Sequence, residues 1–246
     1  MDLDRYLSGL ADQFGVPVER FAVPGVLVVP VAERAGQRRA SHYRVDRHSV
    51  LLISPELGGD FGVWIDDSRS LTFDEFGEWA RSQGATLLGR GMEHLLAAGY
   101  ESIARAPEIT VLDGGSATGI ETVRTLLDDC SEDDLDEAEF EIDALDPYLV
   151  GWIEHDHVLA LAGGRPEPMR PGCMDIGVLV HADARQSGRG RAVVAATVDE
   201  ILAAGHVPLY RCNVDNAGSS RLCRSVGFEV VVEVEAFDWP DRSTSG

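Results

Sequence analysis

The sequence predicts a mixed α/β protein in which a smaller α/β domain precedes a domain of mixed sheet and flanking helices. Strand-like apolar runs alternate with segments of helical periodicity along the 246 residues. This length allows one large or two medium-sized domains, and an apolar content of 44% is enough for a buried core. Pro107 interrupts a helical pattern and a strand follows it, so we expect an accessory domain at residues 1–105 and a second domain at residues 106–246.

The accessory domain opens with an amphipathic helix and continues with strands at residues 25–31, 42–45 and 49–53. No motif accompanies these elements, so they indicate only an accessory α/β domain. This domain is expected to be either a degenerate copy of the second domain or a lid that shapes a pocket there. The apolar side chains that mark the opening helix are Leu3, Leu7, Leu10 and Phe14.

Two further helices are expected in this domain. Thr72 can cap the first, because Glu75 follows at capping-box spacing. Residues 91–98 predict the second, which ends at Gly99.

The second domain begins with a strand at residues 108–112 and a helix around residues 120–127. A hairpin follows, with strands at residues 148–153 and 158–162. Residues 163–172 contain three prolines and predict a loop.

The most informative stretch is a strand, a glycine-containing loop and a helix within residues 174–205. Residues 176–180 alternate so that the even positions face a core. The loop follows at residues 185–190, and Gly205 ends the helix. The helical pattern places Val193, Thr197, Ile201 and Ala204 on one stripe of that helix.

The loop has the properties of an anion-binding site. Gly188 and Gly190 lack the Cβ atom that would hold an anion away from the backbone, so the N–H groups of residues 186–191 can converge on phosphate oxygens. The helix dipole and three arginines add positive potential. An ordinary glycine turn with solvated arginines is the competing interpretation.

Two known phosphate loops do not fit. A Walker loop requires a lysine, and all 21 basic residues of this chain are arginine. A dinucleotide fingerprint requires a third glycine where this chain has Val193.

The segment Arg185-x-x-Gly188-x-Gly190 resembles the acetyl-CoA loop of the GNAT superfamily of N-acetyltransferases. Downstream, residues 216–228 are similar to a second signature of that family, an Asn-Ala-x-Ser segment that leads to Leu-Tyr and Gly-Phe. The resemblance extends less sharply over residues 107–246. It implies transfer of an acetyl group from acetyl-CoA to a primary amine by direct attack in a ternary complex, without a metal.

The resemblance also implies which residues bind acetyl-CoA. In the family, the strand before the loop and the next strand splay apart, and the pantetheine arm pairs with backbone in the gap. Val178, Leu179 and Val180 would then bind the arm from one side, and Asn216 and Ser219 from the other. The pyrophosphate would lie on Arg185, Gln186, Ser187, Gly188, Arg189, Gly190 and Arg191.

One position departs from the family pattern. Cys223 stands where the family has a tyrosine that is assigned to the departing thiolate. A thiol, with a pKa of about 8.5, can donate a proton, but its side chain is shorter than a phenol. Cys223 is therefore a candidate catalytic residue, and a small apolar helix residue is the alternative.

Acyl transfer also needs a group that accepts the proton of the amine. Asp175, which starts the strand before the loop, is the first candidate, with Glu167 and His181 in reserve. A backbone N–H of the same strand would stabilise the oxyanion, as the resemblance implies.

Charge limits the partners of the protein. The net charge of −21 argues against nucleic acid and is compatible with a cationic amine acceptor. Residues 128–143, with ten acidic and no basic side chains, are either an attraction surface for such an acceptor or a solvated segment. Adaptation to high salt would explain the acidity equally well.

The remaining expectations concern location, metals and assembly. No apolar run is long enough to span a membrane and no secretory signal is visible, so we expect a cytoplasmic protein. Four cysteines without paired spacing argue against a zinc site or disulfides. Dimers are common in the family, so a homodimer is one expected assembly. A non-catalytic acyl-CoA-binding regulator is the alternative function, and an interaction module for a basic partner is a third.

Overall fold

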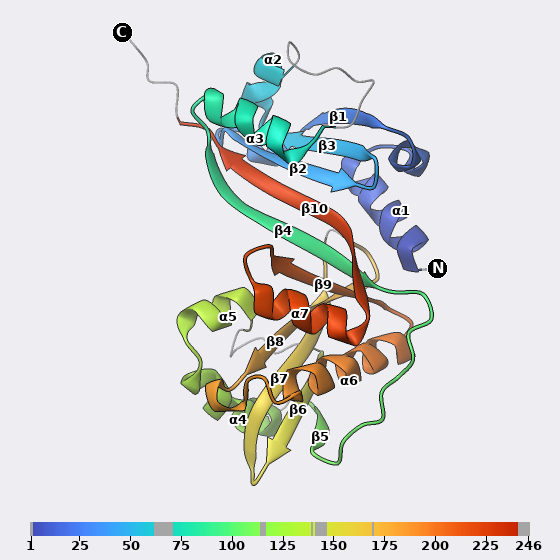
Figure 1. Cartoon of the computed structure of the whole chain (residues 1–246), viewed down its shortest axis with the longest axis vertical. Helices are drawn as coiled ribbons and strands as arrows, with labels where there is room; N and C mark the ends of the chain where they lie inside the picture. Colours follow the sequence, from blue (N-terminus) through green and yellow to red (C-terminus); the bar gives the residue numbers. More distant parts are fainter. Residues whose placement is uncertain are drawn as a thin grey trace. The chain divides into compact units, whose positions relative to one another are not determined.

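The computed structural model describes residues 2–61, 71–113, 117–138, 140, 147–168 and 170–240 (Figure 1). The chain forms two compact units. Unit 1 consists of Met1–Tyr6, His94–Cys212 and Asn216–Glu229, and unit 2 of Leu7–Glu93, Asn213–Asp215 and Val230–Gly246. The units are interleaved in sequence because strands β4 (Thr86–Leu96) and β10 (Phe228–Asp238) contribute residues to both. A boundary at residues 105–106 stays a prediction.

Unit 2 is built on strands in the order β1-β3-β2-β10-β4. Strands β1 and β3 are parallel, whereas β2 is antiparallel to β3 and to β10. The capping box predicted at Thr72 is present at the start of α3. The remaining elements are α1 (Asp2–Phe14), β1 (Gly25–Pro30), β2 (Arg39–Val45), β3 (His48–Ile53), α2 (Gly58–Phe61) and α3 (Phe73–Ser82), with 3-10 turns at Val18–Ala22, Ala32–Arg34 and Pro55–Leu57.

The core of unit 2 is rich in aromatic side chains. The rings of Phe76 on α3 and Phe237 on β10 meet edge to face at 5.4 Å. All six residues of β3 are buried, since both faces of this strand are covered. Aromatic contacts of this kind add to the free energy gained by burying the rings.

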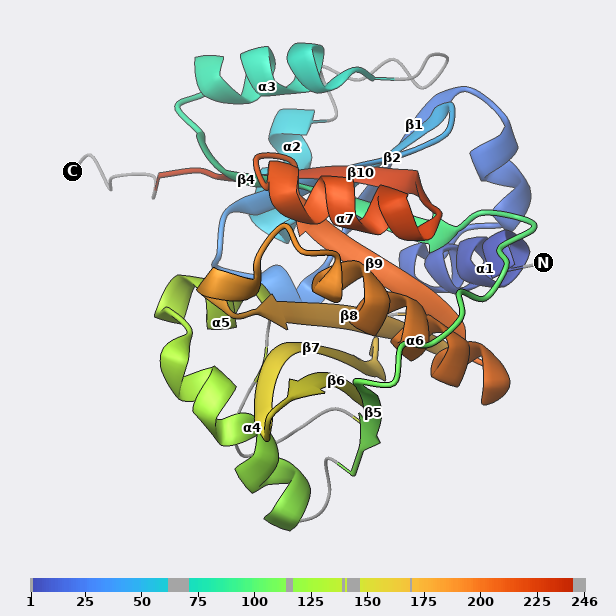
Figure 2. The same ribbon diagram turned by 60° about the horizontal axis from the view of Figure 1, so that its bottom comes forward.

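Unit 1 contains strands in the order β4-β9-β8-β7-β6-β5, with helices on both faces of the sheet (Figure 2). This arrangement confirms the predicted mixed sheet flanked by helices. The elements are β5 (Ile109–Leu112), α4 (Ala117–Asp129), α5 (Glu132–Ala138), β6 (Tyr148–Glu154), β7 (His157–Pro166), β8 (Cys173–Val180), a 3-10 turn at Ala182–Ala184, α6 (Arg189–Ala203), β9 (Val207–Asn213) and α7 (Ala217–Val226).

Opposite faces of this sheet bind different helices. Leu161 of β7 and Leu179 of β8 pack in one cluster with Leu126 of α4. On the other face, Thr197 of α6 donates a hydrogen bond of 3.5 Å to the carbonyl oxygen of Ala162. The sheet is therefore covered on both sides, which fixes the strand that precedes the loop.

Three sequence-based expectations are wrong. Residues 91–98 are not a helix, because 91–96 continue strand β4 and sheet pairing outweighs the leucine-rich helical pattern. Residues 163–166 are not a loop, since Gly163 pairs with Gly177 and Pro166 with Met174. The third wrong expectation is that the even positions of β8 face the core. Leu179, at an odd position, is buried against α4, whereas Val178 and Val180 are only half-buried.

Among the helices that the structure describes, none combines the length and apolar character needed to cross a bilayer.

Candidate active site

The two strands at the centre of unit 1 separate from each other. Strand β8 pairs in parallel with β9 at Cys173↔Val207, Met174↔Pro208 and Asp175↔Leu209, and no further pair follows within the described parts of these strands. The other edge of β8 stays paired with β7 as far as Val180↔Ala160. Backbone groups of residues 176–180 therefore face a gap, as the family resemblance implies.

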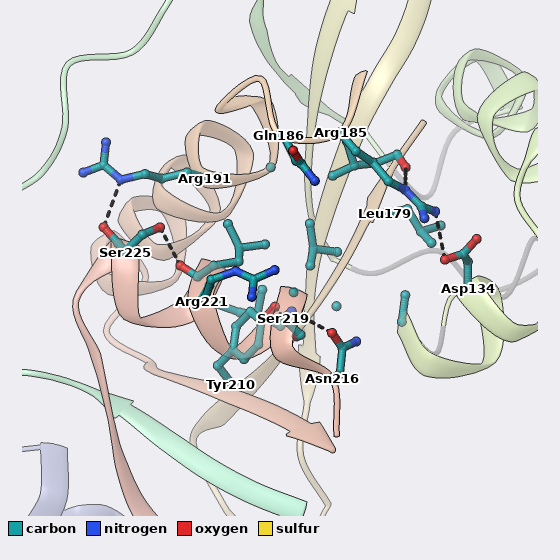
Figure 3. A pocket seen from close by; sticks show the side chains of 18 of the residues that line it. Asp134, Leu179, Arg185, Gln186, Arg191, Tyr210, Asn216, Ser219, Arg221 and Ser225 are labelled. Carbon is teal, nitrogen blue, oxygen red and sulfur yellow. Dashed lines mark hydrogen bonds and ion pairs between the residues drawn. The ribbon is translucent and has the colours of Figure 1, made fainter. Parts of the chain in front are cut away.

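A cavity of about 560 Å³ occupies this gap (Figure 3). Its walls come from β8, from the loop before α6 and the first turn of α6, from β9 and from α7. Helix α5 contributes Asp134 and Ala138 at one side. The volume lies in the range of small-molecule and cofactor sites. The other lining residues are Ile176, Gly177, Val178, Leu179, Val180, Arg185, Gln186, Gly188, Gly190, Arg191, Tyr210, Arg211, Asn216, Gly218, Ser219, Arg221, Leu222 and Ser225.

The loop at the start of α6 has the backbone conformation of an anion site. Gln186 and Gly188 have φ angles of +60° and +85°, and Gly188 is the N-cap of α6. Alternation between left-handed and right-handed conformations turns successive N–H groups toward one point. Because α6 is 15 residues long, its dipole adds positive potential at the same point. The loop can therefore bind a phosphate group.

The arginines of this loop do not all face the cavity. Arg185 and Arg191 line it, and Arg185 forms an ion pair of 2.9 Å with Asp134. Arg189 instead donates to Glu154 at 2.6 Å and lies over the ring of Trp152. Its guanidinium group fastens the β6–β7 hairpin to α6, so only its backbone is available to a phosphate.

The remaining predicted cofactor residues divide in the same way. The hydroxyl of Ser187 donates to the carbonyl oxygen of Ala184, and its side chain does not line the cavity. Asn216 and Ser219 do line it (Figure 3). Asn216 caps α7, since its Oδ1 accepts a hydrogen bond of 2.8 Å from the Ser219 N–H.

Cys223 does not reach the cavity. Its side chain is fully buried and donates a hydrogen bond of 3.4 Å to the carbonyl oxygen of Ser220. Hydrogen bonding with Cys212, and to a smaller extent with His94, lowers the pKa of the Cys223 thiol, although burial opposes this shift. The structure thus brings Cys223 together with Cys212 and His94 and separates it from the lining residues.

None of the three candidates for the proton acceptor is among the residues that line the cavity. Asp175 is buried, and its Oδ2 accepts a hydrogen bond of 2.6 Å from Arg211, which does line the cavity. Glu167 lies 3.4 Å from the same guanidinium group. His181 is at the other end of β8, where its Nδ1 accepts a hydrogen bond from the Asp183 N–H.

No metal centre is found in the described part of the chain, where no three His, Cys, Asp or Glu side chains converge. His155 and His157, which flank the β6–β7 turn, belong to no such group.

Sequence reasoning missed several lining residues. Tyr210 and Arg211 of β9 lie outside both motifs, and Arg221 and Ser225 of α7 lie within the second motif but not at its characteristic positions. The strand pattern of residues 207–213 indicates β9 but not the loss of its partner strand after Leu209. Only that loss brings Tyr210 and Arg211 to the cavity.

Comparisons with known proteins agree with this geometry. Residues 120–228 match the model of the acetyltransferase (GNAT) family. The fold is similar to that of a GCN5-related N-acetyltransferase from Sphaerobacter thermophilus, with a TM-score of 0.54 and 12% identity over 96% of this chain and 91% of that chain. An acetyltransferase from the GNAT family of Colwellia psychrerythraea gives a TM-score of 0.52 and 12% identity over 77% and 76% of the two chains. A comparison with curated proteins gave no significant match.

The span of the family match begins in α4 and ends at Phe228, so it contains all residues that line the cavity. The two similar structures support the fold independently of sequence identity. Residues 120–228 are therefore a domain of the acetyltransferase (GNAT) family, which is a family of acyltransferases.

Proposed function

We propose that the protein transfers an acetyl group from acetyl-CoA to a primary amine by direct attack in a ternary complex. The observation that carries this proposal is the gap between β8 and β9, because it joins an unpaired strand edge to a phosphate-binding loop in one cavity. Acetyl-CoA contains both matching parts, an amide-bearing arm and a diphosphate.

The position of the cofactor follows from these parts. The diphosphate binds to the N–H groups of residues 186–191 and to Arg185 and Arg191. The arm extends along residues 178–180 and pairs with their backbone, with Asn216 and Ser219 opposite. The thioester then lies toward Asp175↔Leu209, where the two strands meet.

The chemistry requires two protein groups near the thioester, a donor for the oxyanion and an acceptor for the proton of the amine. The amine nitrogen bonds to the acetyl carbon and the carbon–sulfur bond breaks, with its electron pair left on sulfur. A backbone N–H of β8 stabilises the oxyanion. We retain Asp175 as the proton acceptor, acting through water, because its Oδ1 is buried and has no hydrogen-bond partner among the described residues.

The acceptor is proposed to be a small cationic amine. Helix α5 has three acidic residues in its first turn, and one of them, Asp134, lines the cavity. We also retain the cytoplasm and a homodimer as proposals for the location and the assembly of the protein.

One observation favours a second candidate function. The residue at the tyrosine position of the family, Cys223, is buried away from the cavity. A regulator that binds acyl-CoA without turnover would need the loop and the strand edge but no donor for the thiolate. Turnover decides between the two functions.

The test combines calorimetric binding with thiol release. Acetyl-CoA should bind to the native protein, and thiol release against a panel of cationic amines should depend on both substrates. Gly188→Glu should reduce the affinity by a factor of about 100 or more, because a carboxylate enters the diphosphate site.

Gly205→Glu is the matched control for this variant. Gly205 has a φ of +78° just beyond the other end of α6, and a Cβ atom there meets nothing within 4 Å, as at Gly188. Both variants therefore carry the same backbone strain. Equal acetyl-CoA affinity of the two variants would refute the cofactor site, and binding without turnover on any amine would favour the regulator.

A further inference from the structure

A tyrosine side chain lines the cavity, although this chain has a cysteine at the position where the family has its tyrosine. Tyr210 of β9 lines the cavity, and its hydroxyl is 2.8 Å from the hydroxyl of Ser219 on α7 (Figure 3). Both residues belong to the wall that faces the unpaired edge of β8. The Tyr210 side chain therefore borders the gap where the arm of an acyl-CoA would lie.

Packing fixes the position of this phenol. Tyr210 is only 1% exposed. The centre of its ring lies 5.6 Å from that of Phe228 and 6.3 Å from that of His94. The His94 ring nitrogen Nδ1 is 3.1 Å from the backbone oxygen of Tyr210. A side chain held by such packing is pre-organised, so little entropy is lost when its hydroxyl bonds to a ligand.

Thiolate departure needs a hydrogen-bond donor of this kind. When the carbon–sulfur bond of a thioester breaks, negative charge develops on sulfur in a cavity that excludes much of the water. A hydrogen bond to a charged acceptor is about twice as strong as one between neutral groups. If Ser219 donates to the phenol oxygen, the phenol becomes a stronger donor through its own O–H.

We propose that Tyr210 donates a hydrogen bond to the sulfur of the departing CoA thiolate, an inference that rests on the function proposed above. The phenol keeps its proton, because phenols are ordinarily weaker acids than thiols. The electron pair of the broken bond remains on sulfur. The thiolate then takes a proton from the solvent, which balances the proton that the amine loses.

Cys223 cannot supply this bond from its observed position. Its sulfur lies in the closed cluster with Cys212 and His94 and donates to the carbonyl oxygen of Ser220. The role that the family gives to one residue of α7 is thus taken over by a side chain from the neighbouring strand.

The experiment measures the pKa of the CoA thiol in its complex with the protein, from the ultraviolet absorbance of the thiolate during a pH titration. This readout needs no amine acceptor. In the native protein, the thiolate should be stabilised by a factor of roughly ten or more over free CoA, as a charge-assisted hydrogen bond predicts. Tyr210→Phe should remove this stabilisation and leave the affinity for desulfo-CoA unchanged.

Two further variants separate a direct role from a structural one. Cys223→Ala should keep the lowered pKa of the CoA thiol. Fluorotyrosine incorporated at position 210 keeps the hydroxyl and its packing but makes it a stronger donor, so the pKa of the thiol should fall further. This variant also provides a test if Tyr210→Phe does not fold.

The proposal is overturned if the pKa of the CoA thiol in the native complex equals that of free CoA, or if Tyr210→Phe leaves a lowered value unchanged. If Cys223→Ala abolishes the lowered pKa of the CoA thiol, the hydrogen-bond donor to the sulfur would be Cys223 of α7 instead. Absence of any CoA binding by the native protein would refute the proposed function itself, which is a different result.

Discussion

At the scale of single residues, the site depends on how much space surrounds each side chain. Cys223 is fully buried where the family has a tyrosine, and its neighbours Cys212 and His94 occupy the space next to its sulfur. Tyr210, two residues before Cys212 on the same strand, lies in the cavity. A tyrosine at position 223 and one at position 210 would therefore have very different surroundings.

This difference predicts the stability of Cys223→Tyr. The added ring has no space in the closed cluster, so the free energy of unfolding should fall by about 1–3 kcal/mol, as in other overpacked cores. Urea unfolding monitored by circular dichroism measures this change. Cys130→Tyr is the control, because Cys130 at the end of α4 is partly exposed and a change within about 0.5 kcal/mol is expected. A Cys223→Tyr protein as stable as the native one would mean that the ring can turn into the cavity.

At the scale of elements, the contact between α6 and β7 sets how closely the helix approaches the sheet. Gly164 of β7 lies under Ile201 of α6, and a Cβ atom at position 164 would be 2.7 Å from Cδ1 of Ile201. The glycine that we expected in a loop is thus needed within a strand, because it lets the helix approach the sheet.

Gly164→Ala is expected to destabilise the protein by about 1–3 kcal/mol through this overlap. Ile201→Val removes Cδ1, so the double variant should recover part of the loss, and a double-mutant cycle measures the coupling. Gly89→Ala on β4, where a Cβ atom meets nothing within 4 Å, is the control. If the effects of the two substitutions are additive, the backbone at position 164, rather than the contact with Ile201, causes the loss of stability.

The elements also show which features a single sequence can predict. Local signals were sufficient for the loop before α6, the cap at Thr72 and the β6–β7 hairpin, since each depends on residues close in sequence. Strand β4 was mistaken for a helix because its pairing partners lie more than 100 residues away. Long-range pairing is not encoded in local periodicity.

The candidate site follows the same rule. The glycine loop and Asn216 were predicted to meet one ligand, and both line the cavity. The orientation of Arg189 toward Glu154 could not be predicted, because that contact joins residues 35 positions apart. Tyr210 was missed for a related reason, since its exposure to the cavity depends on where pairing with β8 stops.

At the scale of the whole molecule, charge repulsion opposes folding. The chain has 42 acidic and 21 basic residues, so the net charge is 21 minus 42, or −21. Folding brings these charges closer together, and dissolved salt screens the repulsion between them. Ion pairs such as Arg189–Glu154 offset only part of it, because exposed pairs contribute little.

We therefore expect the melting temperature to rise as NaCl is added to a low-salt buffer. A gain of about 1 kcal/mol would correspond to about 2–4 °C for a chain of this size. Asp128→Asn and Asp136→Asn remove exposed charges in the last turns of α4 and α5 and should raise the low-salt melting temperature while reducing the effect of salt. A melting temperature that falls with salt would show that attractive ion pairs outweigh the repulsion.

The separation of β8 from β9 also sets a length. Pairing ends at Asp175↔Leu209, and β8 continues to Val180. With a rise of about 3.3 Å per residue, the unpaired edge from Ile176 to Val180 measures about 13 Å. The two strands are at bonding distance at one end of this edge and diverge toward the loop, so the opening is a wedge. The closed end of the wedge therefore limits the length of a linear molecule that is bound at the loop. A molecule longer by one methylene group would not fit.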